Sequence, residues 1–234
     1  MFTFKQFTIH QDRCAMKVGT DGVLLGAWCP IDHNPFSVLD IGAGTGILSL
    51  MVAQRSHADQ IDAIEIDENA YEQCVENFED SPWGDRLFCF HAGLDEFMEE
   101  PEDQYDLIIS NPPFYSEDYK TENEQRDLAR FQDALPFEDL IEAASLLLSE
   151  NGIFAVIIPF KEEAKFIALA GEFNLHPFKI TRVKGTPATE TKRSLIAFSF
   201  TEKKTEETEL IIETARHQYT EDYISLTKEF YLKM

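Results

Sequence analysis

A glycine-rich loop between an apolar segment and a helical pattern constrains the fold of this chain more than any other feature. Residues 37–41 form a short apolar run that predicts a buried strand, and residues 47–54 have the apolar spacing of a helix. The loop between them, residues 42–46, holds three glycines and follows Asp40. Strand, glycine loop and helix in this order open a nucleotide-binding α/β fold. The spacing is D-x-G-x-G-x-G, which differs from the G-x-G-x-x-G of dinucleotide sites.

The next strand and helix place an acid where such folds bind a ribose. A strand is predicted at 61–66 and a helix at 68–78, for which Asp67 is a suitable N-cap. Glu65 follows the glycine loop by about twenty residues, a spacing from which an acid can accept both ribose hydroxyls. An exposed acid at a strand end is the simpler interpretation of Glu65, and the spacing favours the functional one. Further strands are predicted at 2–9, 86–90, 105–110, 153–158, 175–183, 193–200 and 210–212, and helices at 20–28, 137–148, 161–172 and 221–231.

The strand predicted at 105–110 is followed by a short sequence that suits the binding of a planar amine. Asn111, Pro112, Pro113 and Phe114 come directly after it, and the Pro pair cannot continue a sheet. Ligands of open α/β sheets bind at the carboxyl ends of the strands. The Asn111 side-chain oxygen and the Pro112 carbonyl can each accept one N–H of an –NH2 group, and Phe114 offers a flat face to the attached ring. Two acceptors draw the nitrogen lone pair out of conjugation, which makes the nitrogen a better nucleophile.

The same four residues have other interpretations. Taken alone, they are equally compatible with a Pro-rich turn after a strand. If they do bind an amine, an adenine N6, a guanine N2 and a glutamine amide all present a planar –NH2 group. An enzyme that modifies such an amine could therefore act on adenine N6, on guanine N2 of RNA or on a protein glutamine amide, and a non-catalytic nucleotide-binding module stays open as well.

The composition is that of a globular protein with an unusual charge. The 234 residues suffice for one domain with a full core, and we expect no membrane span and no secretory signal. Four widely spaced cysteines indicate reduced thiols of a cytoplasmic protein and no metal site. The net charge of −23 argues against a polyanionic partner. However, residues 176–204 hold seven Lys and Arg against two Glu, which leaves room for a basic face.

The glycine loop and its leading acid resemble motif I of S-adenosylmethionine-dependent methyltransferases. Nearly the whole chain is similar to the bacterial tRNA1(Val) (adenine-37 N6)-methyltransferase family, with matching segments at 2–7, 12–22, 25–28, 81–83, 197–198 and 230–232. The resemblance implies one class I methyltransferase domain over 1–234, with 1–35 as an N-terminal strand and helix extension. It implies a Rossmann-like α/β fold whose mostly parallel, seven-stranded sheet has helices on both faces and an antiparallel C-terminal strand.

The resemblance also implies an S-adenosyl-L-methionine site and no metal. Asp40 would hold the cofactor ammonium, Thr20 and Asp21 its carboxylate, and Ile66 and Leu94 would enclose its adenine. The implied cofactor residues are Lys17, Thr20, Asp21, Asp40, Gly42, Gly44, Gly46, Glu65, Ile66, Gly93, Leu94 and Asn111.

One position, Gly93, departs from the family pattern. The same resemblance also implies which residues are catalytic. Gly93 occupies the place where an acid usually contacts the adenine amine, so either backbone N–H groups there or Asp95 would replace it. The implied catalytic residues are Asn111, Pro112, Phe114 and Tyr115.

The implied substrate is the adenine next to the anticodon of a valine tRNA, methylated by a monomer in the cytoplasm. Residues 115–134 are expected to form a loop and helix over the site. Candidate RNA contacts are Arg13, Lys17, Lys120, Arg126, Arg130 and the basic residues from Lys179 to Arg193.

Overall fold

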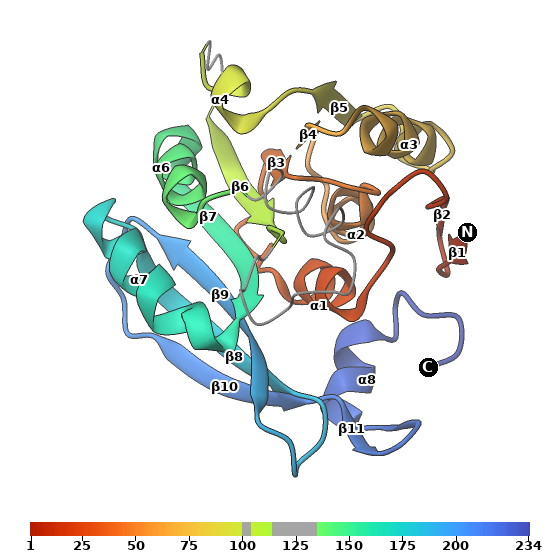
Figure 1. The fold of residues 1–234 in the computed structure, drawn as a ribbon, viewed down its shortest axis with the longest axis vertical. Helices are drawn as coiled ribbons and strands as arrows, with labels where there is room; N and C mark the ends of the chain where they lie inside the picture. The colour runs from red at the N-terminus through yellow and green to blue at the C-terminus, as the bar shows by residue number, and fades with distance from the viewer. Residues whose placement is uncertain (100–103, 114–134) are drawn as a thin grey trace, which may run out of the picture.

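One twisted sheet lies between two layers of helices in the computed structural model of the chain (Figure 1). The structure describes residues 1–99, 104–113 and 135–234. Within these ranges the central sheet has eight strands in the order β10-β8-β9-β7-β6-β3-β4-β5. They are β3 (Ser37–Ile41), β4 (Gln60–Glu65), β5 (Leu87–His91), β6 (Tyr105–Ser110), β7 (Leu148–Pro159), β8 (His176–Lys184), β9 (Thr191–Ser199) and β10 (Glu206–Ile211).

The strand directions define a doubly wound sheet. β5, β4, β3, β6 and β7 are parallel to one another, whereas β9 runs antiparallel to both β7 and β8. The chain enters the centre at β3, whose neighbours are β4 on one side and β6 on the other. The strand order therefore reverses at β3, and such a switch point is where open α/β sheets bind ligands.

The predicted α/β class is confirmed, with one correction to the sheet. The bounds of β3 and β6 agree with the prediction, and β9 is the predicted antiparallel strand. The sheet has eight strands rather than seven, because β10 pairs in parallel with the outer side of β8.

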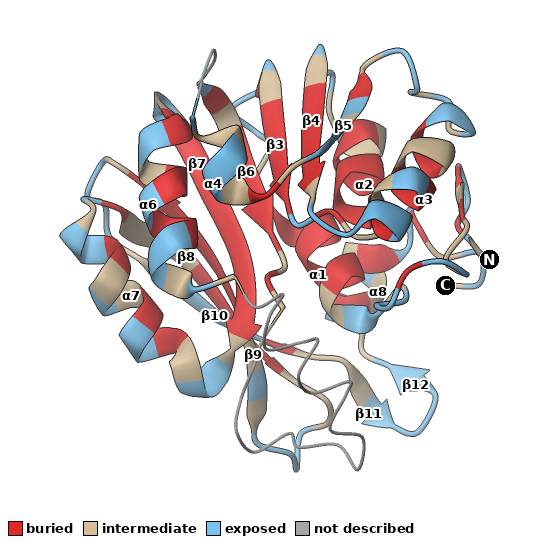
Figure 2. Ribbon diagram, turned by 45° about the horizontal axis from the view of Figure 1, so that its top comes forward, coloured by how far each residue is buried: buried red, intermediate tan, exposed pale blue. Residues whose placement is uncertain are grey.

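The helices cover the two faces of the sheet, whose central strands are apolar on both sides. The consecutive residues Val38 and Leu39 of β3 belong to two separate buried clusters, because successive side chains of a strand point to opposite faces. Figure 2 shows that the buried positions concentrate on the central strands and the inner helix surfaces. One cluster includes residues of α1 (Thr20–Trp28), α2 (Ile47–Arg55), α3 (Glu68–Glu79) and α8 (Glu221–Thr227); the other includes residues of α6 (Phe137–Leu147) and α7 (Glu163–Glu172), with α4 (Leu94–Phe97) packed against it.

The N-terminal extension packs on the α1 side of the sheet and meets the C-terminus there. The short strands β1 (Phe2–Thr3) and β2 (Thr8–Ile9) form an antiparallel pair, and Phe4 between them is 1% exposed. The Lys5 amide donates to the Phe230 carbonyl at 2.8 Å. The two termini consequently lie on the same side of the molecule (Figure 1).

Several predicted boundaries are wrong. Thr20 is a residue type suited to the N-cap of the helix predicted through Trp28, but Gly19 is the N-cap of α1 and Thr20 is its first helical residue. Asn151 and Gly152 are typical of a stop for the helix predicted at 137–148, but this helix ends at Leu147 and β7 begins at Leu148, before them. The short 3-10 helix η2 (Phe160–Glu162) precedes α7, and the closing helix ends at Thr227. The hairpin of β11 (Glu213–Ala215) and β12 (Gln218–Tyr219) was not predicted. None of the helices in the described ranges is long and apolar enough to cross a membrane.

Candidate active site

The carboxyl ends of three neighbouring strands bring the predicted site residues to one edge of the sheet. Ile41 of β3 is level with Ile64 of β4 and with Ser110 of β6. The Ser110 hydroxyl donates to the Ile41 carbonyl at 2.8 Å, which ties the two central strands together where they end. The glycine loop after β3, the acid at the end of β4 and Asn111 after β6 therefore meet at the switch point.

The glycine loop has a backbone that other residues adopt only with strain. Gly42, Gly44 and Gly46 have φ of 74°, 56° and 76°, in the left-handed region that favours glycine. A Cβ on Gly42 or Gly44 would have no protein atom within 4 Å, so the backbone of this loop is open to the close approach of a ligand. A Cβ on Gly46 would lie 2.5 Å from Phe78 Cε1, so this third glycine is needed for helix packing.

Glu65 is held against the glycine loop by backbone amides. Its Oε2 accepts from the Gly44 amide at 2.7 Å and its Oε1 from the Asp67 amide at 2.9 Å. The Gly42 and Ala43 amides both donate to the Ile64 carbonyl at 3.0 Å, so the loop folds back over the end of β4. Glu65 is therefore a half-buried carboxylate with a fixed position beside the open part of the loop. Asp67 caps α3 through the Ala70 amide, as predicted.

Asp40 is fully buried beneath the glycine loop. Its Oδ2 accepts from the Ser49 amide at 3.1 Å and from the Ser49 hydroxyl at 2.8 Å. Its Oδ1 is buried and has no hydrogen-bond partner among the described residues. Burial, helped by the nearby Glu65 carboxylate, raises the pKa of Asp40 to about 7, although the two Ser49 hydrogen bonds act to lower it. A buried acceptor with one unused oxygen is suited to a cationic group bound above the loop.

The pKa of Asp40 predicts a pH dependence of stability in the ligand-free protein. The folded state holds a proton on Asp40 up to about pH 7, whereas the unfolded chain releases it near pH 4. The stabilisation is thus complete below about pH 4 and is lost as the pH rises through about 7, at up to about 1.4 kcal/mol per pH unit. Asp40→Asn keeps an acceptor for Ser49 and should remove this dependence. Urea unfolding of both proteins at pH 5 and pH 7.5 checks it, and an equal stability difference at the two pH values would contradict it.

The end of β4 and the start of α4 form an apolar wall next to Glu65. Ile66 is 61% exposed, and its Cδ1 lies 3.5 Å from where a Cβ on Gly93 would be. The Asp95 Oδ1 lies 3.0 Å from the same point, so this side chain folds back over Gly93. Leu94 is half-buried and packs in part against the core. His91 was not predicted here: its Nε2 donates to the Ile66 carbonyl at 3.1 Å.

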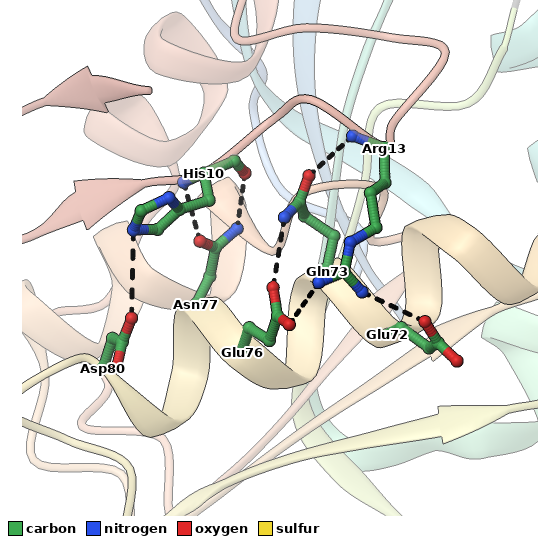
Figure 3. A network of polar contacts seen from close by, with 7 residues as sticks. All are labelled: His10, Arg13, Glu72, Gln73, Glu76, Asn77 and Asp80. Atoms are coloured by element: carbon green, nitrogen blue, oxygen red, sulfur yellow. Dashed lines mark hydrogen bonds and ion pairs between the residues drawn. The ribbon is translucent and has the colours of Figure 1, made fainter.

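The segment between β2 and α1 is fastened to α3 by a network of polar contacts (Figure 3). The buried Asn77 accepts from the His10 amide at 2.7 Å and donates to the His10 carbonyl at 2.9 Å. It also donates to the Thr45 carbonyl at 2.9 Å, so it links the N-terminal segment to the glycine loop. Arg13, predicted as an RNA contact, pairs with Glu72 at 3.0 Å and with Glu76. Its charge is thus compensated within the fold.

Three predicted cofactor residues lie at the start of α1. Lys17 and Thr20 are exposed, and Asp21 pairs with Arg193 Nε of β9 at 2.8 Å. A Cβ on Gly22 would lie 3.2 Å from Ile47 Cγ2, so this end of α1 packs against the start of α2, directly after the glycine loop. The structure therefore brings Asp21 to the loop as one half of an ion pair.

Asn111 is half-buried and Pro112 is buried directly after β6. The other two predicted catalytic residues, Phe114 and Tyr115, lie outside the described residues, as do Lys120, Arg126 and Arg130. The arrangement of the described residues provides a glycine cradle, one carboxylate beneath it (Asp40), one at its edge (Glu65) and an amide acceptor one strand away.

Comparison with known proteins identifies the family. Residues 29–178 match the family model described as the methyltransferase small domain. A curated relative from Flavobacterium johnsoniae, named tRNA1(Val) (adenine(37)-N6)-methyltransferase, is 76% identical, and the match covers 100% of both chains. A relative of the same name from Bacteroides fragilis is 45% identical over 100% of this chain and 98% of its own. Among solved structures, a predicted O-methyltransferase from Agrobacterium tumefaciens has a TM-score of 0.71 at 21% identity, covering 90% of this chain and 96% of that one, which shows the shared fold.

Proposed function

The chain belongs to the tRNA1(Val) (adenine(37)-N6)-methyltransferase family, and on this premise we propose that it transfers a methyl group from S-adenosyl-L-methionine to N6 of adenine 37 in tRNA1(Val). The observation that carries the proposal is the pairing of β3 with β6. Asn111 and Pro112, which we propose as the acceptors for an amino group, directly follow β6 and so lie one strand away from the glycine loop.

The described residues fit the cofactor. Gly42 and Gly44 leave room for its methionine part, and Glu65, held beside the loop by the Gly44 amide, would accept the ribose hydroxyls. The unused Oδ1 of Asp40 suits the ammonium group. Ile66 supplies an apolar surface for the adenine ring. When bound, S-adenosylmethionine supplies an electron-poor methyl carbon on a sulfonium.

The chain's own residues orient the amine. The Asn111 oxygen and the Pro112 carbonyl would accept the two N6–H atoms of adenine 37 and direct the nitrogen lone pair toward the methyl carbon. Most of the acceleration then comes from alignment of the reacting atoms. No strong base is required, because the methylated amine is acidic while it carries the positive charge. The adenine must leave its stack in the anticodon loop, which costs a few kcal/mol at most in a single strand.

The partner and setting follow from this substrate. We propose that the enzyme acts as a monomer in the cytoplasm, on the anticodon loop of valine tRNA. The acidic net charge of −23 means that RNA must be bound by a limited part of the surface, because most of the molecule repels phosphates.

Nucleoside mass spectrometry tests the proposal. Unmodified tRNA1(Val) is incubated with enzyme and methyl-labelled cofactor, digested and analysed, beside a transcript with guanine at position 37. We expect labelled N6-methyladenosine from the first RNA only. Labelled N2-methylguanosine would indicate the guanine alternative, and label found only in protein from a cell extract would indicate the glutamine alternative. If the protein binds the cofactor but transfers no methyl group, the result would support the non-catalytic nucleotide-binding module.

A further inference from the structure

An exposed aromatic ring makes a cation–π contact with a guanidinium at the carboxyl end of β7. Phe160 follows this strand directly and remains 39% exposed. The guanidinium carbon of Arg182, from β8, lies over the Phe160 ring at 5.9 Å from its centre. Phe166, six residues later on α7, is fully buried, so the two phenylalanines of this segment have different surroundings. Phe160 contributes little to the core.

The buried carboxylate of Glu163 fixes the position of the Arg182 guanidinium. Glu163 is 8% exposed, and its two oxygens accept from Arg182 Nε at 3.0 and 3.1 Å; its Oε1 also accepts from Arg182 Nη2 at 2.7 Å. The Ser194 hydroxyl donates to the same carboxylate. Arg182 Nη1 pairs with the exposed Glu207 at 2.8 Å. A bidentate pair of this kind holds the guanidinium plane in one orientation, so the surface of Phe160 and Arg182 is preformed.

The pair lies beside the amine-binding end of β6. β6 and β7 are parallel neighbours, with Ser110 level with Val156. Asn111 is one residue beyond that level and Phe160 is four, so the two differ by three residues, or about 10 Å along the strands. At this separation Asn111 can hold one base while Phe160 contacts its neighbour. It suits a base adjacent to the target in the same strand.

We propose that Phe160 and Arg182 form a stacking platform for a nucleobase next to the target adenine in single-stranded RNA. The inference rests on the proposed function and names a substrate subsite for it. Aromatic rings bind unpaired bases by stacking without regard to sequence, and the flat face of a fixed guanidinium extends the stacking surface. A preformed platform would hold the loop after the target base has turned out.

The test compares Phe160→Ala with Phe160→Trp and with Phe36→Ala. Phe36 is a matched control because it is 60% exposed and precedes β3, at the opposite edge of the sheet. Steady-state methylation is measured with an anticodon stem-loop of tRNA1(Val), and the affinity for S-adenosylhomocysteine is measured by calorimetry. We expect Phe160→Ala to raise KM for the RNA about tenfold, since stacking on one base contributes that much or more. Phe160→Trp should keep the wild-type KM, and Phe36→Ala should change nothing.

The outcomes separate this inference from the function on which it rests. If wild-type enzyme methylates the stem-loop but Phe160→Ala has the KM of Phe36→Ala, the platform is refuted and the proposed function stands. If Phe160→Ala weakens binding of S-adenosylhomocysteine as much as it raises the KM for RNA, its role is structural and the platform is also refuted. If wild-type enzyme leaves the RNA unmethylated, both proposals fall.

Discussion

Replacing Asn111 with alanine is expected to lower kcat by about 100-fold or more while the affinity for S-adenosylhomocysteine stays near that of the wild type. The side chain would contribute one of two acceptors that orient the adenine amine, and loss of one preorganised polar contact of this kind costs about that factor. Asn111 follows β6 and is half-buried, so its truncation removes little core packing. The folded state should therefore survive the change.

Single-turnover methylation of the tRNA at saturating cofactor measures this effect directly. Asn151→Ala is the matched control, because Asn151 is exposed and lies near the opposite end of the neighbouring strand β7. Asn111→Asp retains an acceptor oxygen and should lose less activity than Asn111→Ala. If Asn111→Ala turns over at the wild-type rate, the side chain has no part in orienting the amine, and the proposed mechanism would have to be abandoned.

The central part of the fold could be predicted from the sequence because its signals are local. The apolar runs of β3 and β6 are ended by a glycine loop and by a Pro pair, and both strands have the predicted bounds. The register that makes Ile41 level with Ser110 is a consequence of parallel pairing at a switch point. Consequently the edge of the sheet that carries the candidate site was predictable from these two boundaries alone.

The start of β7 could not be predicted, because a tertiary contact overrides the local signal. Asn151 and Gly152 are typical of a helix end, but Leu148 already pairs with Tyr105, and the register shifts before Leu107 pairs with Ile153. A Cβ on Gly152 would lie 2.7 Å from Leu148 Cδ1 and 2.9 Å from the Tyr105 carbonyl. Gly152 is therefore needed at the register shift of β7, because a side chain there would collide with Leu148 and with the Tyr105 backbone.

The fastening of the N-terminal segment also lies beyond sequence reasoning. Arg13 is a basic residue and was therefore predicted as an RNA contact. Its ion pairs with Glu72 and Glu76 become visible only once residues 10–13 are seen packed on α3. The role of Asn77 could not be predicted from the sequence. Its side chain donates to the carbonyls of His10 and Thr45, which are 67 and 32 residues away in the chain. Several predicted basic contacts of β8 and β9 are compensated in the same way, since Lys184 pairs with Glu209 and Arg193 with Asp21, both at distances that the sequence gives no means to foresee.

Gly46→Ala is expected to destabilise the protein by about 3 kcal/mol. Two effects add at this position. The left-handed backbone, with φ of 76°, costs a non-glycine residue about 1–2 kcal/mol, and overpacking a close-packed interior costs about 1–3 kcal/mol more. The new methyl group would lie 2.5 Å from Phe78 Cε1 and 2.9 Å from Cys74 Sγ, both on the buried side of α3.

Two other glycines separate the backbone effect from the packing effect. Gly42 has φ of 74° but open space around it, so Gly42→Ala should cost only the backbone term, about 1–2 kcal/mol. Gly171 lies in α7 with open space and an ordinary φ, so Gly171→Ala should be neutral or slightly stabilising. Urea unfolding of the three variants without cofactor gives these values. Equal losses for Gly46→Ala and Gly42→Ala would show that α3 can move away from the loop, and the glycine cradle would then lack the rigid support on which the proposed cofactor site depends.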